Sequence, residues 1–440
     1  MRVLKFGSMS IASPQRMKLA AEIVLKSPRC VVILSAMAGT TAALEETSNY
    51  FYHKNIEGAN EIINRLETKY LTEISSLYSS EQTKAAAIEF VSSKFNYMRS
   101  FSNELFTLFE ERIILAQGEL LSSGLFHLLL TETMADAVFV QAADFMQTDK
   151  NKEPDHVHIK EHLKAILGAN TEASVFVTQG YICRNVYGEI DDLRSSGGSD
   201  YTASLVGAAI GADEIQIWTD VNNMQNDENS DSEIFSGSQP VRQLDFDEAA
   251  ELAYFGAKIL HPTCVLPAKM ANIPVRMLNI LEPENKGTII SNKTETGTIK
   301  AVAAKDGITI VQIKSGRMLL VHGFLRKIFE IFDYYQTAID MIATSEVSIS
   351  VTIDNPRNLQ AITDDLKKYG TVSVDQNMSL ICVVGDLDWN TLGYSSQILD
   401  AVKTVPLRMV SYGGSNNNMS FLVRQQDKAT ALALLNKQLF

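Results

Sequence analysis

The sequence contains little glycine, proline or cysteine, and it has no run of positive charge. Only 24 Gly and 10 Pro occur among 440 residues, which leaves little room for collagen-like or low-complexity segments. Lys and Arg number 39 against 52 Asp and Glu, giving a formal net charge of -13. Because this charge repels phosphate backbones and anionic lipid headgroups, we expect no nucleic-acid or membrane partner.

The cysteines and the N-terminal residues indicate the cellular compartment. The four cysteines are far apart, lack any C-x-x-C spacing and lie mostly in apolar surroundings, so we expect reduced, buried thiols. The first residues turn polar too early for a secretory signal, and we expect that no later apolar run approaches the length of a membrane span. The sequence therefore predicts a cytoplasmic protein.

The length and the apolar pattern predict an α/β protein of more than one domain. A chain of 440 residues exceeds what one hydrophobic core usually supports. Buried strands are predicted at 2–6, 30–34, 137–141, 174–178, 214–218 and 274–278. Helical patterns lie at 17–25, 81–117, 201–210 and 246–260. This alternation predicts a mostly parallel sheet with helices on both faces, a three-layer αβα sandwich.

The C-terminal third has a different rhythm. Segments 308–313, 324–332, 347–353 and 359–369 follow a strand, helix, hairpin, helix order that returns, weakly, after residue 379. Two ferredoxin-like βαββαβ units are therefore predicted, at about 315–378 and about 379–440, with a strand from 300–314. A polar stretch before residue 297 suits a linker, so the domains are predicted at 1–297 and 298–440. Paired units of this kind favour a sensor of small molecules.

Polar residues follow the predicted strands at the edge where parallel α/β sheets bind ligands. Lys5-Phe-Gly7-Ser8 follows the first strand, and Ser35-Ala-Met-Ala-Gly-Thr-Thr41 follows the second. Gly197-Gly198-Ser199-Asp200 opens a helix, whose free N–H groups attract anions. Each segment alone has an ordinary alternative, such as a solvated lysine or a helix cap. No G-x-x-x-x-G-K-[ST] loop is present, which excludes a P-loop kinase.

Three further segments belong to the same group of candidates. Thr219-Asp220 ends another strand, Lys258 lies at the end of an amphipathic helix, and Gln117-Gly-Glu119 is predicted to end the long helical stretch. Asp220 could instead form a turn, and Lys258 could balance a helix C-terminus. A buried Glu119 would need a cationic partner such as a substrate ammonium group, whereas an exposed helix glutamate is the alternative.

Taken together and in this order, the motifs resemble the aspartokinase family along nearly the whole chain. They are Lys5-Phe-Gly, Ser35-Ala-Met, Gln117-Gly-Glu, Gly197-Gly-Ser-Asp-Tyr-Thr-Ala, Trp218-Thr-Asp and Phe255-Gly-Ala-Lys-Ile-Leu-His-Pro. The resemblance implies an amino-acid kinase domain that uses ATP with Mg2+ to phosphorylate the L-aspartate side chain, followed by two regulatory ACT units. It implies no metal site formed by protein residues alone.

The resemblance also implies a role for each matching residue. Lys5 and Asp200 are the expected catalytic residues, since phosphoryl transfer depends on positioning and electrostatics. The aspartate is expected at Ser35, Thr41, Glu119, Ser199 and Arg194. The nucleotide is expected at Gly7, Ser8, Gly198, Thr219, Asp220 and Lys258.

Several positions depart from the family pattern. Ser8 and Met9 replace Gly-Thr, Ser196 replaces an arginine before Gly-Gly-Ser-Asp, and Ala42 replaces an amide or carboxylate. Residues 222–230 lack the aromatic and the cation that are usual there. Arg194 would reach the substrate carboxylate only if the intervening loop bulges. Two hypotheses therefore stay open: a working aspartate kinase, or a weakly active or inactive chain that still senses an amino acid.

For the regulatory units, the resemblance implies lysine or threonine as an effector, and a homodimer through the ACT region. The matching effector positions are Met318, Gly323, Phe324, Leu325, Asp340, Thr344, Ser345, Glu346 and Val347. A third functional class rests on His158-Ile-Lys-Glu161-His162, which has the H-x-x-E-H spacing of a zinc peptidase. A solvated helix face is the favoured alternative for this segment.

Overall fold

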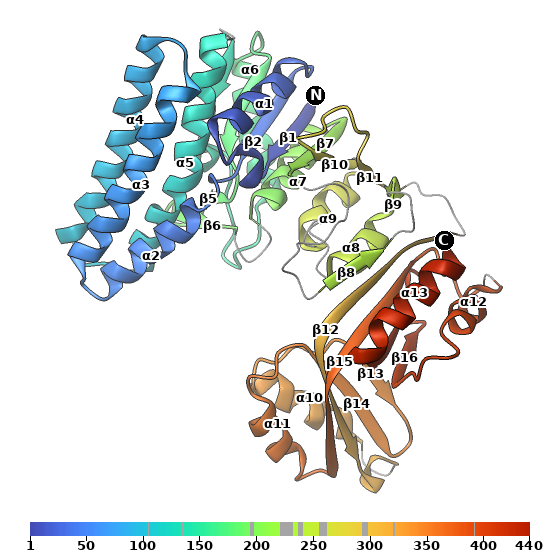
Figure 1. Ribbon diagram of the computed structural model, residues 1–440. Coiled ribbons are helices and arrows are strands. Elements are labelled where there is room, and N and C mark those ends of the chain that lie inside the picture. Colours follow the sequence, from blue (N-terminus) through green and yellow to red (C-terminus); the bar gives the residue numbers. More distant parts are fainter. Residues whose placement is uncertain are drawn as a thin grey trace. The chain divides into compact units, whose positions relative to one another are not determined.

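The computed structural model describes residues 1–103, 105–133, 136–193, 198–220, 232–235, 241–254, 262–292, 298–319, 322–390 and 392–440 (Figure 1). The chain divides into two compact units. The first comprises Met1–Asn223 with Leu260–Lys293, and the second comprises Met224–Ile259 with Thr294–Phe440. The predicted linker before residue 297 lies outside the described residues.

The first unit is built on a mostly parallel sheet. Its strands lie in the order β3-β4-β2-β1-β7-β10-β11, and only the β10–β11 pair is antiparallel. The strands are β1 (Arg2–Phe6), β2 (Cys30–Leu34), β3 (Ala137–Phe139), β4 (Val175–Gln179), β7 (Glu214–Thr219), β10 (Val275–Asn279) and β11 (Thr288–Ile290). All six strands predicted for this region are confirmed, and β1, β2, β4, β7 and β10 are buried along most of their length. The strand predicted at 137–141 is shorter, because β3 ends at Phe139, and it is only partly buried.

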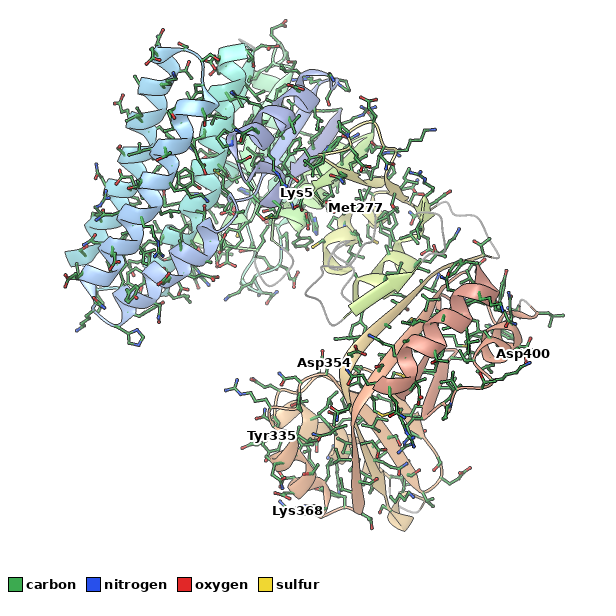
Figure 2. The ribbon with its side chains drawn as sticks, viewed as in Figure 1. Lys5, Met277, Tyr335, Asp354, Lys368 and Asp400 are labelled. Carbon is green, nitrogen blue, oxygen red and sulfur yellow. The ribbon has the colours of Figure 1, made fainter. Side chains whose placement is uncertain are left out.

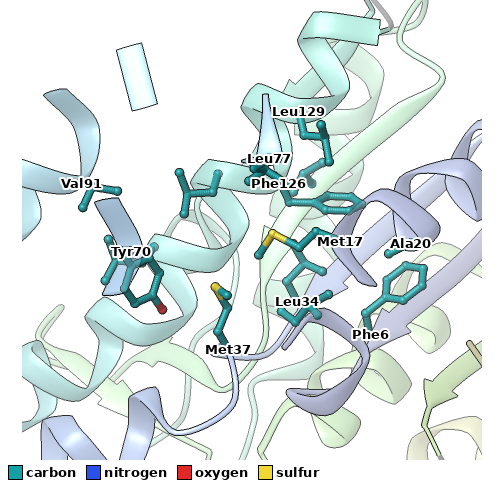
Figure 3. Packing of buried hydrophobic residues seen from close by; sticks show 14 of the residues in the cluster. Phe6, Met17, Ala20, Leu34, Met37, Tyr70, Leu77, Val91, Phe126 and Leu129 are labelled. Carbon is teal, nitrogen blue, oxygen red and sulfur yellow. The ribbon is translucent and has the colours of Figure 1, made fainter. Parts of the chain in front are cut away.

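Helices cover both faces of this sheet, and the strand pleat decides which residues face which layer. Leu4 and Phe6 pack in a core with Met17, Leu34 and Phe126, which Figure 3 shows from close by. Lys5 lies between Leu4 and Phe6 and therefore points to the opposite face, where α7 packs on β1. The helices of this unit are α1 (Pro14–Leu25), α2 (Thr40–Tyr52), α3 (Ile56–Leu77), α4 (Glu81–Ser100), α5 (Leu108–Thr133), α6 (His156–Ala169), α7 (Gly198–Ile210) and α9 (Pro262–Met270).

The single helical stretch predicted at 81–117 is wrong. Helix α4 ends at Ser100, and α5 begins at Leu108 and continues to Thr133. Thr107 starts the new helix, because its N–H and hydroxyl donate to Glu110 and its Oγ1 accepts from the N–H of Phe109. Gln117 and Glu119 therefore lie in the middle of α5.

The expectation that no apolar run approaches a membrane span also needs correction. Helix α5 is long and apolar enough to cross a membrane by length and composition alone, and 78% of its most apolar window is buried in the fold.

The second unit holds an antiparallel sheet in the order β13-β14-β12-β15-β17-β16. Two long strands, β12 (Ile299–Lys314) and β15 (Thr371–Gly385), run through both ferredoxin-like repeats, and the register between them shifts around Ile308. The predicted strand at 300–314 thus serves both repeats. The other strands are β8 (Ser232–Phe235), which pairs with β12, β13 (Ile342–Thr344), β14 (Ser348–Ile353), β16 (Met409–Tyr412) and β17 (Asn418–Arg424).

Each repeat has its own hydrophobic core. Helices α10 (Phe324–Tyr334) and α11 (Leu359–Leu366) pack on one half of the sheet around Phe332. Helices α12 (Tyr394–Ala401) and α13 (Lys428–Leu439) pack on the other half around Phe421. Separate cores under one continuous sheet confirm the predicted pair of ferredoxin-like units.

Helix α8 (Phe246–Tyr254) belongs to the second unit, although it precedes the regulatory residues by more than forty positions in the sequence. Asp245 and Glu248 form a capping box at its start, with Glu248 Oε2 accepting from the N–H of Asp245 at 2.8 Å and Asp245 Oδ1 accepting from the N–H of Glu248 at 2.7 Å. Glu251 accepts from Ser415 and Asn418 beside β17. The helix predicted from residue 246 is confirmed at its start, and residues 255–261 lie outside the described residues.

Candidate active site

The centre of the candidate site is an ion pair between Lys5 and Asp200. Lys5 is only 7% exposed, and its Nζ lies 2.6 Å from Asp200 Oδ1. Figure 2 shows Lys5 within the sheet of the first unit. Asp200 lies in the first turn of α7, where the helix dipole stabilises a carboxylate. Gly198 begins that helix with φ +60°, a conformation that favours glycine. The two predicted catalytic residues are therefore brought together.

The turn after β1 is bound to the end of β7. The N–H of Gly7 donates to the carbonyl of Trp218 at 3.1 Å, and the buried Ser10 hydroxyl donates to the same oxygen at 2.8 Å. Ser8 has φ -54° and ψ -40°, an ordinary right-handed conformation in which a side chain causes no strain. The serine that departs from the family pattern at this position is thus compatible with the turn.

Glu119 lies at the turn after β2, as the substrate-site prediction requires. Glu119 is only 7% exposed, and its Oε1 accepts a hydrogen bond from the N–H of Ala36 at 3.2 Å. A Cβ on the neighbouring Gly118 would come within 2.8 Å of the Ala36 side chain, so glycine allows this close approach. The alternative of an exposed helix glutamate is wrong. Ser35 is held in the same place, because its carbonyl accepts from the Ser122 hydroxyl at 2.7 Å.

The end of β4 and the start of α7 pack against each other. A Cβ built on Gly180 would lie 2.4 Å from Ser199 Oγ, so Ser199 sits directly on the backbone that follows β4. Thr202 Oγ1 accepts from the N–H of Tyr181 at 3.0 Å and strengthens this contact. Within the described part of the chain, the buried Thr178 hydroxyl on β4 has no hydrogen-bond partner. Thr178 is a polar group at this edge that sequence reasoning missed.

Thr41, Thr219 and Asp220 lie on segments around the same sheet edge. Thr41 is exposed in the first turn of α2, whereas its neighbour Thr40 is buried and shares a hydrogen bond of 2.9 Å with Tyr70. Thr219 and Asp220 are half-buried at the end of β7. Arg16 Nη1 lies 3.3 Å from Asp220 Oδ2. Arg16 carries no motif, so sequence reasoning missed this cation.

A second arginine that sequence reasoning missed is Arg112, on α5 two turns before Glu119. Its Nε lies 3.1 Å from Asp191 Oδ1 on β6 (Ile190–Asp192), which pairs with β5 (Ile182–Arg184), and both side chains are largely buried. The chain runs from Asp191 toward Ser199. The pair therefore ties the helix that carries Glu119 to the segment that leads into α7. Arg194, Ser196, Lys258 and positions 222–230 lie outside the described residues.

The predicted effector residues lie in the second unit around β13 and the start of α10. Gly323 precedes α10 with φ +79°, and Phe324 is buried in the core of the first repeat. The other members are Met318 and Leu325, which are partly exposed, and Thr344, Ser345, Glu346 and Val347, which are exposed around the β13–β14 turn. Ser345 and Ser348 share a hydrogen bond of 2.7 Å between their hydroxyls.

Asp340 is a carboxylate of this group, and it is hydrogen-bonded to α8. The Tyr254 hydroxyl donates to Asp340 Oδ1, while Oδ2 is buried without a partner among the described residues. Burial raises the pKa of Asp340, and the Tyr254 hydrogen bond opposes that rise. Lys305 Nζ lies 5.0 Å from the centre of the Tyr254 ring and 2.8 Å from Asp354, which Figure 2 labels.

Among the described residues, the histidines and cysteines form no group that could hold a metal ion. The rings of His158 and His162 stack at 3.7 Å on α6, and His162 Nδ1 lies 2.9 Å from the carbonyl of His158. The described residues contain no group of three or more His, Cys, Asp or Glu that could hold a metal ion, so the peptidase hypothesis gains no support. All four cysteines are buried, and none of them forms a disulfide. Burial raises the pKa of Cys30 to about 12, which keeps that thiol protonated.

Comparison with known proteins finds relatives along the whole chain. The amino acid kinase family matches residues 1–279, and an ACT domain matches residues 381–439. Lysine-sensitive aspartokinase 3 of Escherichia coli is 30% identical over an alignment covering 100% of this chain and 99% of the relative. Aspartokinase 2, chloroplastic, of Arabidopsis thaliana is also 30% identical, over 100% of this chain and 84% of the relative.

Solved structures give the same assignment. Escherichia coli aspartokinase III in complex with aspartate and ADP superposes with a TM-score of 0.79 at 28% identity, covering 100% of both chains. The same enzyme in complex with lysine and aspartate gives a TM-score of 0.81, covering 100% of this chain and 99% of that chain. The aspartate kinase of Clostridium acetobutylicum, at 22% identity and a TM-score of 0.85, supports the fold. The chain therefore belongs to the amino acid kinase family and, within it, to the aspartokinases.

Proposed function

We propose that this protein is a working aspartate kinase that transfers the γ-phosphoryl group of ATP to the side-chain carboxylate of L-aspartate. The product would be 4-phospho-L-aspartate, from which lysine, threonine and methionine are made. The observation that carries the proposal is the 2.6 Å ion pair of Lys5 and Asp200 at the carboxyl edge of a parallel sheet. A buried ammonium held at that edge is placed to stabilise the charge of a phosphoryl group in transfer.

The reaction needs no general base from the protein. An aspartate side chain has an ordinary pKa of about 3.9, so it is already a carboxylate at neutral pH. The chain's task is to hold the carboxylate oxygen in line with the γ-phosphorus and to stabilise the leaving ADP oxygen. Lys5 would supply positive charge near the transferred group, and Asp200 would fix the direction of its ammonium.

The residues around this pair divide between the two substrates. Glu119 is a buried carboxylate, and by the family resemblance we assign it to the ammonium group of L-aspartate. Ser35, Thr41 and Ser199 would hold the other polar groups of L-aspartate, and Arg194 is a candidate to bind its α-carboxylate. The nucleotide would contact Gly7, Ser8, Gly198, Thr219, Asp220 and Lys258.

Mg2+ fits the donors that the site offers. Asp200 and Asp220 present carboxylate oxygens, the ligand type that Mg2+ prefers, and Mg2+ usually binds through one or two carboxylates together with substrate phosphates. A larger protein ligand cluster is therefore not required. When bound with ATP, Mg2+ would neutralise part of the charge on the phosphates.

We also propose that residues 1–297 form the catalytic domain and that residues 298–440 sense an amino acid effector. Lysine is the first candidate, because the Escherichia coli relative is named lysine-sensitive and one of its structures holds lysine. Threonine is the second. A homodimer through the ACT region, which the family resemblance implies, and a cytoplasmic location complete the proposal.

The test is a coupled ADP-release assay of the purified chain with L-aspartate, ATP and Mg2+. Turnover should depend on aspartate, and hydroxylamine should trap the acyl phosphate as a hydroxamate, which simple ATP hydrolysis would not yield. L-asparagine, which has an amide in place of the side-chain carboxylate, serves as the control substrate. A folded protein that releases no ADP with aspartate would refute the kinase and leave the alternative of an inactive amino-acid sensor.

A further inference from the structure

We propose that Arg16 is a positioning residue of the nucleotide site, which locks the turn after β1 to Asp220 at the end of β7. The proposal rests on the kinase function proposed above and adds a residue that lies outside the six motifs quoted from the sequence. Arg16 Nη1 donates to Asp220 Oδ2 at 3.3 Å and also to the carbonyl of Met9. One guanidinium thus joins two segments that the resemblance assigns to ATP.

The base of this arginine is fixed by the start of α1. Ser13 caps the helix, its hydroxyl accepting from the N–H of Arg16 at 3.3 Å, and Pro14 occupies the first helical position. A guanidinium presents several N–H donors in a rigid plane, so a single arginine can bond a carboxylate and a carbonyl at once. The side chains of Arg16 and Asp220 are both about three-quarters buried, which limits their screening by solvent.

The contact completes a set of three attachments between the turn and β7. Gly7 N–H and Ser10 Oγ both bond to the carbonyl of Trp218. These two bonds fix the backbone just before Thr219, and Arg16 fixes the Asp220 side chain. Loss of Arg16 would leave a partly buried carboxylate that lacks this ion pair, at the place where a nucleotide must bind.

The sequence lacks another cation that the family has near the nucleotide, so the ion pair of Arg16 with Asp220 takes on a role at this site. The family's cation after Thr219-Asp220 is absent from residues 222–230. Arg16 instead brings a guanidinium to Asp220 from α1. The residues assigned to L-aspartate, such as Glu119 and Ser35, lie on α5 and after β2. We therefore expect Arg16 to affect binding of ATP without affecting binding of aspartate.

The experiment measures steady-state KM values for both substrates in Arg16→Ala and Arg16→Lys. Loss of hydrogen bonds from a charged donor predicts a KM for ATP raised about tenfold in Arg16→Ala, with the KM for aspartate changed by less than about twofold. Arg16→Lys should recover part of the loss, because it keeps the charge without the planar fork. Arg65→Ala is the matched control, since Arg65 forms an exposed pair with Glu46 on helices of the same unit.

A purely structural role for Arg16 would give a different pattern. It would lower the thermal midpoint and raise both KM values together, and this result would overturn the proposal, as would an unchanged KM for ATP. In the double variant that combines Arg16→Ala with Asp220→Asn, the KM for ATP should be no higher than in whichever of the two single variants has the higher KM for ATP. Additive losses would show that Arg16 does not act through Asp220.

Binding of ADP with Mg2+ separates this inference from the kinase proposal. If the unmodified protein does not turn over but is stabilised by ADP, the kinase proposal fails while Arg16 is still tested. Arg16→Ala should then lose most of the thermal stabilisation that Arg65→Ala retains. Absence of ADP binding by the unmodified protein would overturn both proposals.

Discussion

Lys5 Nζ and Asp200 Oδ1 lie 2.6 Å apart, although one residue comes from the first strand and the other from a helix that starts at Gly198. The ammonium is almost fully buried, so its charge requires a partner before any substrate arrives. Asp200 provides that partner from the first turn of α7. The pair thus holds the Lys5 side chain at the carboxyl edge of the sheet.

Replacement of Lys5 by Met should abolish most of the activity and leave the fold intact. Removal of one charge that stabilises a transition state lowers kcat by about 10²–10³-fold. The ADP-release assay measures this loss. Lys18→Ala, on the exposed side of α1, is the control and should keep normal kcat. A Lys5→Met variant with more than half of the normal kcat would contradict the assigned role.

Ser8→Gly, which restores the family residue, should change little. Ser8 already adopts right-handed backbone angles, so glycine brings no relief of strain and only greater freedom in the unfolded chain. We expect kcat/KM for ATP within about threefold of the unmodified value, equivalent to less than about 1 kcal/mol. A gain of tenfold or more would mean that the serine impairs the nucleotide site.

Arg112→Ala should destabilise the first unit. It leaves Asp191 buried beside α5 without this ion pair, and breaking a buried pair in this way costs about 3 kcal/mol or more. The thermal midpoint, followed by calorimetry, should fall by several degrees. Arg112→Ala with Asp191→Ala should be less destabilised than Arg112→Ala alone, because no unpaired charge remains. Equal midpoints for Arg112→Ala and the unmodified protein would contradict this reading.

Glu248 should make the stability of the second unit depend on pH. The residue is 0% exposed, and burial with Asp245 and Asp386 nearby raises its pKa from 4.5 to about 7, against the opposing effects of its backbone hydrogen bond and Lys300. Between these values the folded chain binds a proton that the unfolded chain has lost. Stability from this group is therefore present below about pH 4.5 and is lost as the pH rises to about 7.

The matching experiment compares thermal midpoints at pH 5, 6, 7 and 8. Glu248→Gln keeps an acceptor for the N–H of Asp245 and cannot ionise, so its midpoint should fall less over this range than that of the unmodified protein. Glu330→Gln, at an exposed position on α10, is the control. Parallel pH curves for all three proteins would show that Glu248 does not titrate in this window.

Tyr254→Phe should make the protein more sensitive to lysine. The Tyr254 hydroxyl bonds to Asp340, the carboxylate expected to receive the effector, so it competes with an ammonium group. Removal of a hydrogen bond to a charged group should lower the inhibitory lysine concentration by roughly tenfold. Inhibition curves provide the measurement, with Tyr334→Phe at a solvent-exposed tyrosine as the control. Unchanged inhibition would exclude competition at Asp340.

Local patterns in the sequence were sufficient for the architecture of the first unit. Each buried strand is a short apolar run, and the motifs at Lys5, Ser35 and Thr219 lie at or just after the ends of parallel strands, so parallel pairing brings these three to one edge. The prediction for 81–117 failed because α4 and α5 share a helical pattern, and the cap formed by Thr107 and Glu110 was not recognised. The helical periodicity stops at Ser100 and resumes at Leu108, and so short an interruption is easily overlooked in the sequence.

Sequence order alone determined the family, the strands and the convergence of Lys5, Glu119 and Asp200 at one edge, since these depend on local runs and on the geometry of parallel sheets. Tertiary structure decided the partners of the remaining charges: Asp220 with Arg16, Asp191 with Arg112, and Asp340 with Tyr254. These contacts join positions far apart in the chain and follow no periodicity. A charged side chain pairs with the groups that lie near it in space, and only the folded chain brings those groups within hydrogen-bonding distance.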